Sequence, residues 1–335
     1  MRRTAGALVA ALALSGLVAC DPRIPPTLTV TSNGTGGDAA PGDGVCEATA
    51  GAGDCTLPAA VDEANALGRA AISVPTGAYD GMDLTVTGDV RLNWRAPAAV
   101  VLGDVDITVA AGGALLAEGL RTRVSDPPPE GSNEPGVHPV TLSVAGELRL
   151  VRSTIASIGA SIVDGVPTDR TLVVAPGGSA VLNTSVLVGG QHAVVNDGEL
   201  ASFASSLYSL VSAQLITNEG ATSQYARTAF TTLSPTVRVF SSCLGDGSFV
   251  SLGGNSAERA GCLSAGDVGS YAANRFDIYT MQVTWPALTP TIDAIPVGTL
   301  LCDPAGTDIY SAPWGVDGNG DGIGGCDVGA AELQP

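Results

Sequence analysis

An acidic, glycine-rich stretch near the C-terminus carries the sharpest chemical motif of the chain. Asp317, Asn319 and Asp321 occupy alternate positions, and Gly322 follows the third of them. This spacing places three side-chain oxygens on one side of a turn, with the carbonyl oxygen of Ile323 as the next ligand, as in calcium-binding loops. The sequence therefore predicts a calcium site here.

The same stretch departs from the usual calcium loop at its twelfth position. Val328 stands there, in place of the glutamate that supplies two oxygens. Asp327 lies one residue earlier and is the expected substitute. Without the glutamate we expect weak binding, with a dissociation constant on the order of 10⁻⁴ to 10⁻³ M. The alternative is a plain Asp/Asn/Gly turn, held by hydrogen bonds between side chains and backbone.

No catalytic constellation stands out in the sequence. Cleavage of a polysaccharide requires paired carboxylates for hydrolysis, or a basic residue as general base for elimination. Asp104 and Asp106 come nearest to a pair, but alternating charges are typical of the solvated face of a strand. His138 lies in a proline-rich loop, and His192 has no carboxylate motif beside it. The sequence therefore predicts no catalytic residue.

The first twenty residues predict export. Arg2 and Arg3 precede an uncharged, mainly apolar stretch of signal-peptide type, residues 5–18. The stretch ends in Leu-Val-Ala-Cys, which resembles a bacterial lipobox. This resemblance implies cleavage after residue 19 and acylation of Cys20, and thus a membrane-anchored lipoprotein that faces the periplasm or the cell exterior. The alternative is an ordinary signal peptide with a chance cysteine at its end.

The charge of the chain excludes some partners. Its 335 residues include 15 basic residues, all of them arginine, against 33 acidic ones. Loss of Arg2 and Arg3 with the leader takes the formal charge from −18 to −20. Such a surface repels nucleic acid and anionic lipid headgroups. The bilayer, reached through the lipid on Cys20, and a polysaccharide or surface protein remain as candidate partners.

Six further cysteines follow Cys20. An even number in an exported chain predicts disulfides, for which about fifteen pairings are formally open. A zinc site is a weak alternative, because no CxxC motif occurs and both histidines lie far from the cysteines. In a repeat structure, sequence neighbours stay close in space. This favours the pairs Cys46–Cys55, Cys243–Cys262 and Cys302–Cys326.

The elements that must position these residues come from a repeat between residues 138 and 254. Each copy has an alternating apolar run, a glycine turn, a second alternating run and a Ser/Thr pair. The turns lie at Gly146, Gly177, Gly198 and Gly220, and the last two intervals are 21 and 22 residues. This period, without helical spacing, predicts an all-β solenoid, most naturally a right-handed parallel β-helix.

The core and the loops of the repeat can also be predicted. Hydrophobic residues make up 45% of the chain but aromatic residues only 4%, so Val, Ile, Leu and Ala must fill the interior. Val105, Ile107 and Val109 alternate with polar residues and are expected to point inward. The runs 125–138 and 160–170 are expected to be loops. The first contains three consecutive prolines, which cannot donate to a strand ladder.

Residues 45–79 resemble the CSLREA region at the N-terminus of many secreted bacterial β-helix proteins. The resemblance implies a short helix with Leu57, Val61 and Ala64 on one face, which covers the open end of the core. Pro58 and Ala59 depart from the pattern, and the usual glutamate of the capping box is lost. The matching residues are Cys55-Thr56-Leu57, Ala64-Asn65, Ile72 to Val74, Pro75, Gly77 and Tyr79.

The C-terminal part resembles the segment known as a choice-of-anchor Q domain. Three motifs match it in order: Gly254-Asn255, Pro290-Thr291-Ile292-Asp293 and the run Cys326 to Glu332. An Asp-Gln-Arg-Gly stretch of the family is degraded here to residues 307–310. Many members continue into a sorting anchor, for which the lipid on Cys20 would substitute.

These observations predict five segments along the chain. We expect a non-catalytic structural, adhesive or glycan-contacting module of the cell surface or periplasm. The alternative is a polysaccharide lyase or hydrolase. The segments are a lipoprotein signal peptide (1–19), a tether with a first strand (20–44), an N-terminal cap (45–95), the coils (96–254) and a loop-rich C-terminal segment (255–335).

Overall fold

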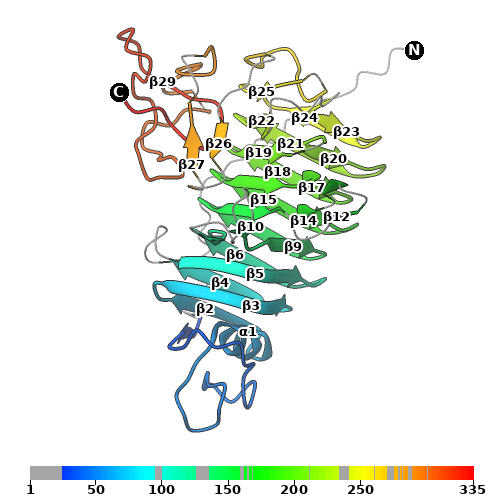
Figure 1. The fold of residues 1–335 in the computed structure, drawn as a ribbon, viewed down its shortest axis with the longest axis vertical. Helices are drawn as coiled ribbons and strands as arrows, with labels where there is room; N and C mark the ends of the chain where they lie inside the picture. The colour runs from blue at the N-terminus through cyan, green and yellow to red at the C-terminus, as the bar shows by residue number, and fades with distance from the viewer. Residues whose placement is uncertain are drawn as a thin grey trace, which may run out of the picture.

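Short β-strands in parallel sheets make up most of the protein (Figure 1). Among the described residues, no helix is long and apolar enough to cross a membrane. The leader and Cys20 lie outside the described residues. The computed structural model describes residues 25–94, 100–125, 136–158, 162–163, 166–167, 169–210, 212–233, 241–259, 261–269, 275–277, 280, 282–285, 289–299 and 301–335.

The nine-stranded sheet runs the length of the molecule. Each strand pairs in parallel with the equivalent strand of the next copy of the repeat. Its order is β1 (Thr27–Thr29), β2 (Arg69–Val74), β4 (Asp89–Trp94), β6 (Ala114–Glu118), β10 (Glu147–Val151), β15 (Ser179–Asn183), β18 (Glu199–Phe203), β21 (Thr222–Ala226) and β24 (Ser248–Ser251).

Two further sheets complete the stack, and both are parallel. The seven-stranded sheet contains β3 (Gly77–Val86), β5 (Val100–Val109), β9 (Val140–Val144), β14 (Arg170–Val174), β17 (His192–Asn196), β20 (Leu215–Thr217) and β23 (Cys243–Leu244). The five-stranded sheet contains β11 (Thr154–Ser157), β16 (Val186–Gly189), β19 (Ser206–Ser209), β22 (Ala229–Thr232) and β25 (Ser256–Ala257).

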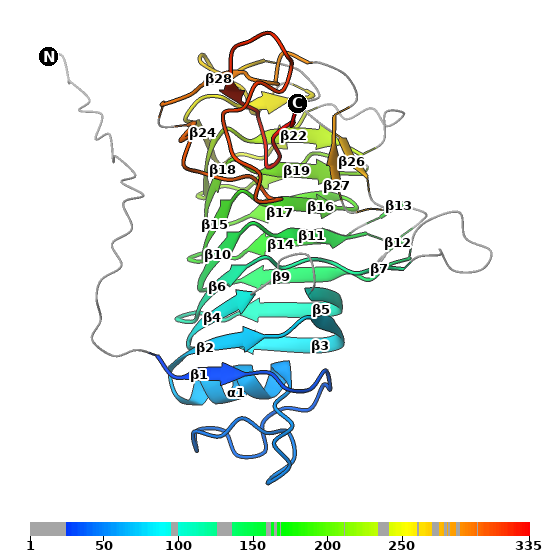
Figure 2. The ribbon, with the colours of Figure 1, turned by 90° about the vertical axis from the view of Figure 1, so that its left-hand side faces the viewer.

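From β9 onward the chain visits the three sheets in a fixed rotation. It passes from the seven-stranded to the nine-stranded and then to the five-stranded sheet, and the next round pairs with the round before it (Figure 2). Ile107, Leu142, Leu172, Val194 and Leu215 share one register column, and each is at most 1% exposed. The predicted aliphatic core is confirmed, as is the inward orientation of Val105, Ile107 and Val109.

The helix α1 (Leu57–Ala66) lies across the N-terminal end of the stack (Figure 2). Thr56 caps it by accepting the amide of Ala59 at 3.1 Å, so the helix starts without the capping-box glutamate. Leu57 and Val61 are at most 2% exposed against the core. The side chain of Asn65 bonds the backbone of residues 85, 87 and 88, which fixes the next turn.

The glycine turns of the repeat fall into two kinds. Gly177 and Gly220 have positive φ angles of 80° and 82°, which favour glycine. Gly146 and Gly198 instead lie where the backbones of successive rounds touch. A Cβ on Gly198 would lie 2.3 Å from the carbonyl oxygen of Gly178 in the round below. The repeated glycines therefore serve chain reversal in some turns and close stacking in others.

A ladder of hydroxyl groups explains the repeated Ser/Thr pairs. At the corner between the nine-stranded and five-stranded sheets, the amide of Ser153 donates to the side chain of Ser185, and the amide of Ser185 donates to that of Ser205. Each serine hydroxyl also donates to the carbonyl two residues earlier. All three serines are fully buried, so these bonds satisfy backbone groups that water cannot reach.

We expect Ser205→Ala to lower the free energy of unfolding by about 2 kcal/mol, because it leaves the buried amide of Ser185 without its acceptor. Ser143→Ala, on the exposed side of β9, is the matched control and is expected to change stability by less than about 0.5 kcal/mol. Denaturant titration of both variants measures the difference. Equal effects at the two positions would mean that the ladder contributes nothing.

The C-terminal segment packs against the outer face of the five-stranded sheet. Two antiparallel pairs belong to it, β26 (Arg275–Asp277) with β27 (Gln282–Thr284) and β28 (Ile295–Pro296) with β29 (Gly325–Cys326). Tyr208 of β19 lies 5.4 Å from Phe276 between ring centroids, and Val188 and Ile309 join the same apolar cluster. Both faces of the five-stranded sheet are therefore buried, which explains why consecutive residues along its strands are buried.

Two loop predictions need correction at their ends. The run 125–138 was expected to hold no strand, yet β7 (Val124–Ser125) pairs antiparallel with β8 (Gly136–Val137). In the second loop, β12 (Ile162–Val163) pairs with β13 (Val166–Pro167). Proline blocks a ladder only where it must donate, so the ends of a proline-rich loop can still pair. The three prolines themselves lie outside the described residues.

The three predicted disulfides are confirmed: Cys46–Cys55, Cys243–Cys262 and Cys302–Cys326. All three link residues that are near in sequence, as linear stacking requires. The last one closes the segment between Cys302 and Cys326, which carries the acidic motif.

Candidate functional site

The side chains of the acidic motif turn toward their own loop. Asp317 accepts the amides of Gly320 and Gly322, both at 2.7 Å. Asn319 accepts the amide of Asp321 at 2.9 Å, and Asp321 accepts that of Ile323 at 2.8 Å. The three predicted ligands therefore lie together in one exposed loop, held by the bonds of the Asp/Asn/Gly turn that the sequence left as the alternative.

Asp327 does not join this loop. Its carboxylate is buried and accepts the amides of Asp293 and Leu333, at 2.7 and 2.6 Å. Asp293, which the sequence did not single out as a ligand, accepts the amides of residues 318 and 319 instead. Within the described ranges, no three His, Cys, Asp or Glu residues are placed to hold a metal ion. The structure therefore does not place Asp327 where it could replace the missing glutamate as a calcium ligand.

Calcium binding by Asp317, Asn319, Asp321 and the carbonyl of Ile323 stays a prediction. For weak binding, 10 mM calcium is expected to raise the melting temperature by about 2–4 °C. The double variant Asp317→Ala with Asp321→Ala is expected to lose that rise. Equal rises in the native protein and in the double variant would indicate general charge screening, and the motif would then be only a turn.

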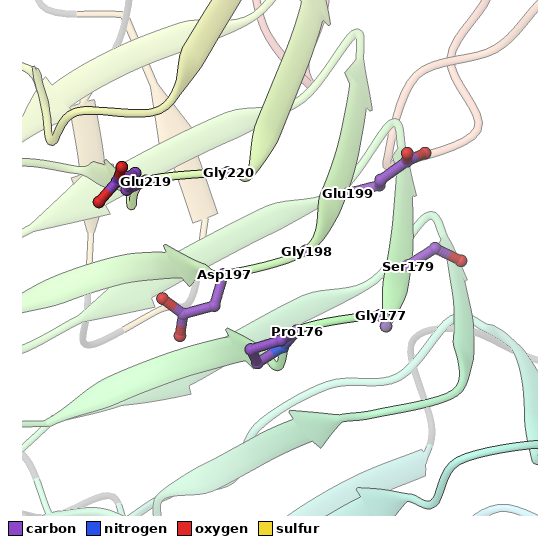
Figure 3. A pocket seen from close by; sticks show the side chains of 9 residues that line it. Pro176, Gly177, Ser179, Asp197, Gly198, Glu199, Glu219 and Gly220 are labelled. Atoms are coloured by element: carbon purple, nitrogen blue, oxygen red, sulfur yellow. The ribbon is translucent and has the colours of Figure 1, made fainter.

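A shallow groove of about 570 Å³ crosses the turns that lead into the nine-stranded sheet (Figure 3). Its floor is a column of glycine turns from three successive rounds. Figure 3 shows Asp197 and Glu219 on one side of these turns and Glu199 on the other. The lining residues are Pro176, Gly177, Gly178, Ser179, Asp197, Gly198, Glu199, Glu219 and Gly220.

The charged side chains that line this groove can accept hydrogen bonds. Three carboxylates line it and no basic residue does. Glycine at the turns keeps the floor free of side chains, so that a ligand can approach the backbone closely. The sequence contained this site in its repeat, but only the stacking of the rounds brings Asp197, Glu199 and Glu219 to one groove.

A second polar cluster lies over Gly103 on the seven-stranded sheet. The Nδ1 atom of His138 lies 2.8 Å from the carboxylate of Asp104, and Arg123 pairs with Asp80. A Cβ on Gly103 would lie 2.3 Å from Asp80 and 2.9 Å from the Cβ of His138, so these groups converge above it. Asp104 has a positive φ of 52°, an uncommon conformation outside glycine.

Asp104 and Asp106, the nearest to a carboxylate pair in the sequence, bond different partners. Asp104 bonds His138, whereas Asp106 accepts the hydroxyl of Thr141 on the next strand. His192 is half-buried, and its Nδ1 atom lies 2.8 Å from the carbonyl of Ala213. Burial lowers the pKa of His192, which is consistent with a structural role.

A fully buried ionic cluster joins the C-terminal segment to the coils, and the sequence did not reveal it. Arg227, in the turn between β21 and β22, donates from Nε to the carbonyl of Asp327 at 2.6 Å and from Nη2 to Glu332 at 3.1 Å. Its guanidinium lies 4.2 Å from the centre of the Trp314 ring. A cation held between an aromatic face and a carboxylate, away from water, fixes both partners tightly.

Further carboxylates surround the same arginine. Glu332 also accepts the amides of Gly315 and Asp327, and Asp308 accepts the amide of Glu332 at 3.1 Å. Burial lowers the pKa of Arg227 to about 10. Burial, and then repulsion by Glu332, raises the pKa of Asp327 to about 7, and burial also raises the pKa of Glu332 and of Asp308.

One sequence signal could have pointed to Arg227. It occupies the corner position just before a buried Ser or Thr, which Arg152, Thr184 and Ala204 hold in the earlier rounds, and all four residues have φ angles near 50°. The run Cys326 to Glu332 was noted in the sequence, but its partner in the coils was not. Comparison of the chain with protein-family models, with curated proteins and with solved structures finds no match.

Proposed function

We propose that this chain is a right-handed parallel β-helix of the exported bacterial type, with a CSLREA-like cap and a choice-of-anchor Q-like end. The fixed rotation through three sheets and the parallel pairing of equivalent residues support it. Right-handedness follows from the general rule for parallel crossover connections. The helix α1 covers one end of the stack, as the resemblance implies.

The proposed address is a membrane, with the protein anchored by a lipid on Cys20 and facing the periplasm or the cell exterior. The leader supports it: two arginines, an apolar stretch and the Leu-Val-Ala-Cys ending. Three disulfides agree with an oxidising compartment.

The proposed activity is non-catalytic contact with a neutral polysaccharide. The groove over the glycine turns is the observation that carries this proposal, because its carboxylates can accept hydrogen bonds from sugar hydroxyls. Successive turns lie one strand spacing apart, about 4.8 Å. A sugar polymer laid along the stack would thus cross the turns of three successive rounds and meet carboxylates from two of them. The formal charge near −20 disfavours acidic polymers.

Binding of the purified ectodomain to neutral and acidic polysaccharides tests this proposal. The variant Asp197→Asn, Glu199→Gln, Glu219→Gln is expected to weaken binding to a neutral polymer at least tenfold, because each changed group loses acceptor capacity. The control variant Asp43→Asn, Asp83→Asn, Asp303→Asn removes the same charge at exposed sites elsewhere. Equal binding by both variants, or binding to acidic polymers alone, would overturn the proposal.

Cleavage of a polysaccharide is the second candidate function. The convergence of Asp104, His138, Asp80 and Arg123 over Gly103 favours it, because a histidine held by a carboxylate is a common general base. The same polysaccharides are therefore also assayed for new chain ends. Cleavage by the native protein that His138→Gln abolishes would establish this function in place of the first.

A further inference from the structure

The C-terminal segment is held to the coils by more buried acids than bases. Arg227 is the cation at the centre, and the carboxyl groups of Asp308, Asp327 and Glu332 are buried around it. Asp293 faces Asp327 from the other side, and Tyr310 lies near Asp308. Three ionised carboxylates buried together would repel one another more than one guanidinium can offset.

Asp327 is the acid best placed to carry a proton. Its carboxylate accepts two backbone amides, and Arg227 contacts its carbonyl but not its carboxylate. Asp308 accepts three amides, and Glu332 accepts two amides and the guanidinium. The carboxyl group with the fewest donors gains least from its charge, so it is the first to become neutral.

We infer that docking of residues 290–335 onto the five-stranded sheet takes up a proton at Asp327, so that the C-terminal segment is a pH-dependent clasp. The clasp is tight in acid and loosens as the pH rises. Loosening would expose the apolar outer face of the sheet, formed by Val186, Val188 and Tyr208. This regulation goes beyond the proposed binding of a polysaccharide and does not depend on it.

The direction of the pH dependence follows from the shift in the pKa of Asp327. The pKa of Asp327 is raised on docking from 3.8 to about 7. An acid whose pKa is raised stabilises the docked state while protonated, fully below about pH 4, and this contribution is lost as the pH rises to about 7. Burial shifts Asp308 and Glu332 in the same direction.

Hydrogen exchange on the full ectodomain, with its disulfides intact, tests the clasp. The amides of Gly329 and Ala330 report docking, because they bond the carbonyl of Arg227 and the hydroxyl of Ser206 on the coils. After correction for intrinsic rates, their protection is expected to fall about 100-fold between pH 5 and pH 8. The amides of β15 and β18 serve as the reference and are expected to keep their protection.

Two variants separate the clasp from a general effect of pH. Asp327→Asn is expected to give a flat profile, and Asp303→Asn, an exposed acid of the same segment, is expected to keep the native one. A fall that persists in Asp327→Asn overturns the inference. A change of less than threefold in the protection of the native protein between pH 5 and pH 8 also overturns the inference. If Asp327→Asn does not fold, the pH profile of the native protein decides by itself.

Discussion

Replacing Arg227 with alanine is expected to lower the free energy of unfolding by about 3–5 kcal/mol. The change leaves the carboxylates of Glu332 and Asp308 buried without their cation, and it removes the contact with Trp314. Breaking a buried pair from one side is costly because the remaining charge cannot reach water. Denaturant titration of the disulfide-intact ectodomain measures the loss.

Arg152→Ala is the matched control for this prediction. Arg152 occupies the same corner with nearly the same φ angle, 47° against 51° for Arg227. Its ion pair with Glu118 is about one-third exposed, so solvent screens it and we expect a loss of less than about 1 kcal/mol. Similar losses in both variants would mean that the corner geometry, and not the buried charge, is what matters.

Gly198→Ala is expected to cost about 3 kcal/mol or more. Its Cβ would lie 2.3 Å from the carbonyl oxygen of Gly178 and 2.6 Å from that of Ala175. Both neighbours are backbone atoms of the round below, so the rounds themselves must move apart. The amide of Glu199 donates to the same carbonyl of Gly178, and that bond is expected to weaken as well.

Gly220→Ala provides the comparison, because it changes the same residue type one round later. A Cβ there meets open space, and only the positive φ of 82° opposes it, at a cost of about 1–2 kcal/mol. Thermal unfolding of the two variants ranks them. A larger loss of stability in Gly220→Ala would mean that the positive φ at the chain reversal, and not the close stacking of rounds, is the stronger constraint on these turns.

The features that sequence revealed are those that depend on near neighbours. The period of 21 and 22 residues, the inward Val105 and Ile107 and the three disulfides all follow from local spacing. The helix over residues 57–66 follows from its apolar face and the cap at Thr56. Each of these links residues at most 24 positions apart, so tertiary packing reinforces the local pattern and does not override it.

The features that could not be predicted from the sequence depend on partners that are distant along the chain. Arg227 meets Glu332 across 105 residues, and no periodic pattern links the two. Asp104 and His138 lie one round apart, but the proline-rich loop between them breaks the period, so their register could not be counted. Asp327 seemed a ligand of the acidic loop because it is near in sequence, yet burial turns it toward Asp293 and Leu333.

The clasp segment contacts several rounds at once, so its contacts depend on how many rounds lie between them. Thr307 contacts Arg152, Ala330 donates to Ser206, and Glu332 reaches Arg227. One additional round between the first and last of these contacts would displace one end by about 4.8 Å and separate partners that now bond. Duplication of a repeat on the N-terminal side of Arg152 would thus keep these contacts, whereas duplication between Arg152 and Arg227 would break them.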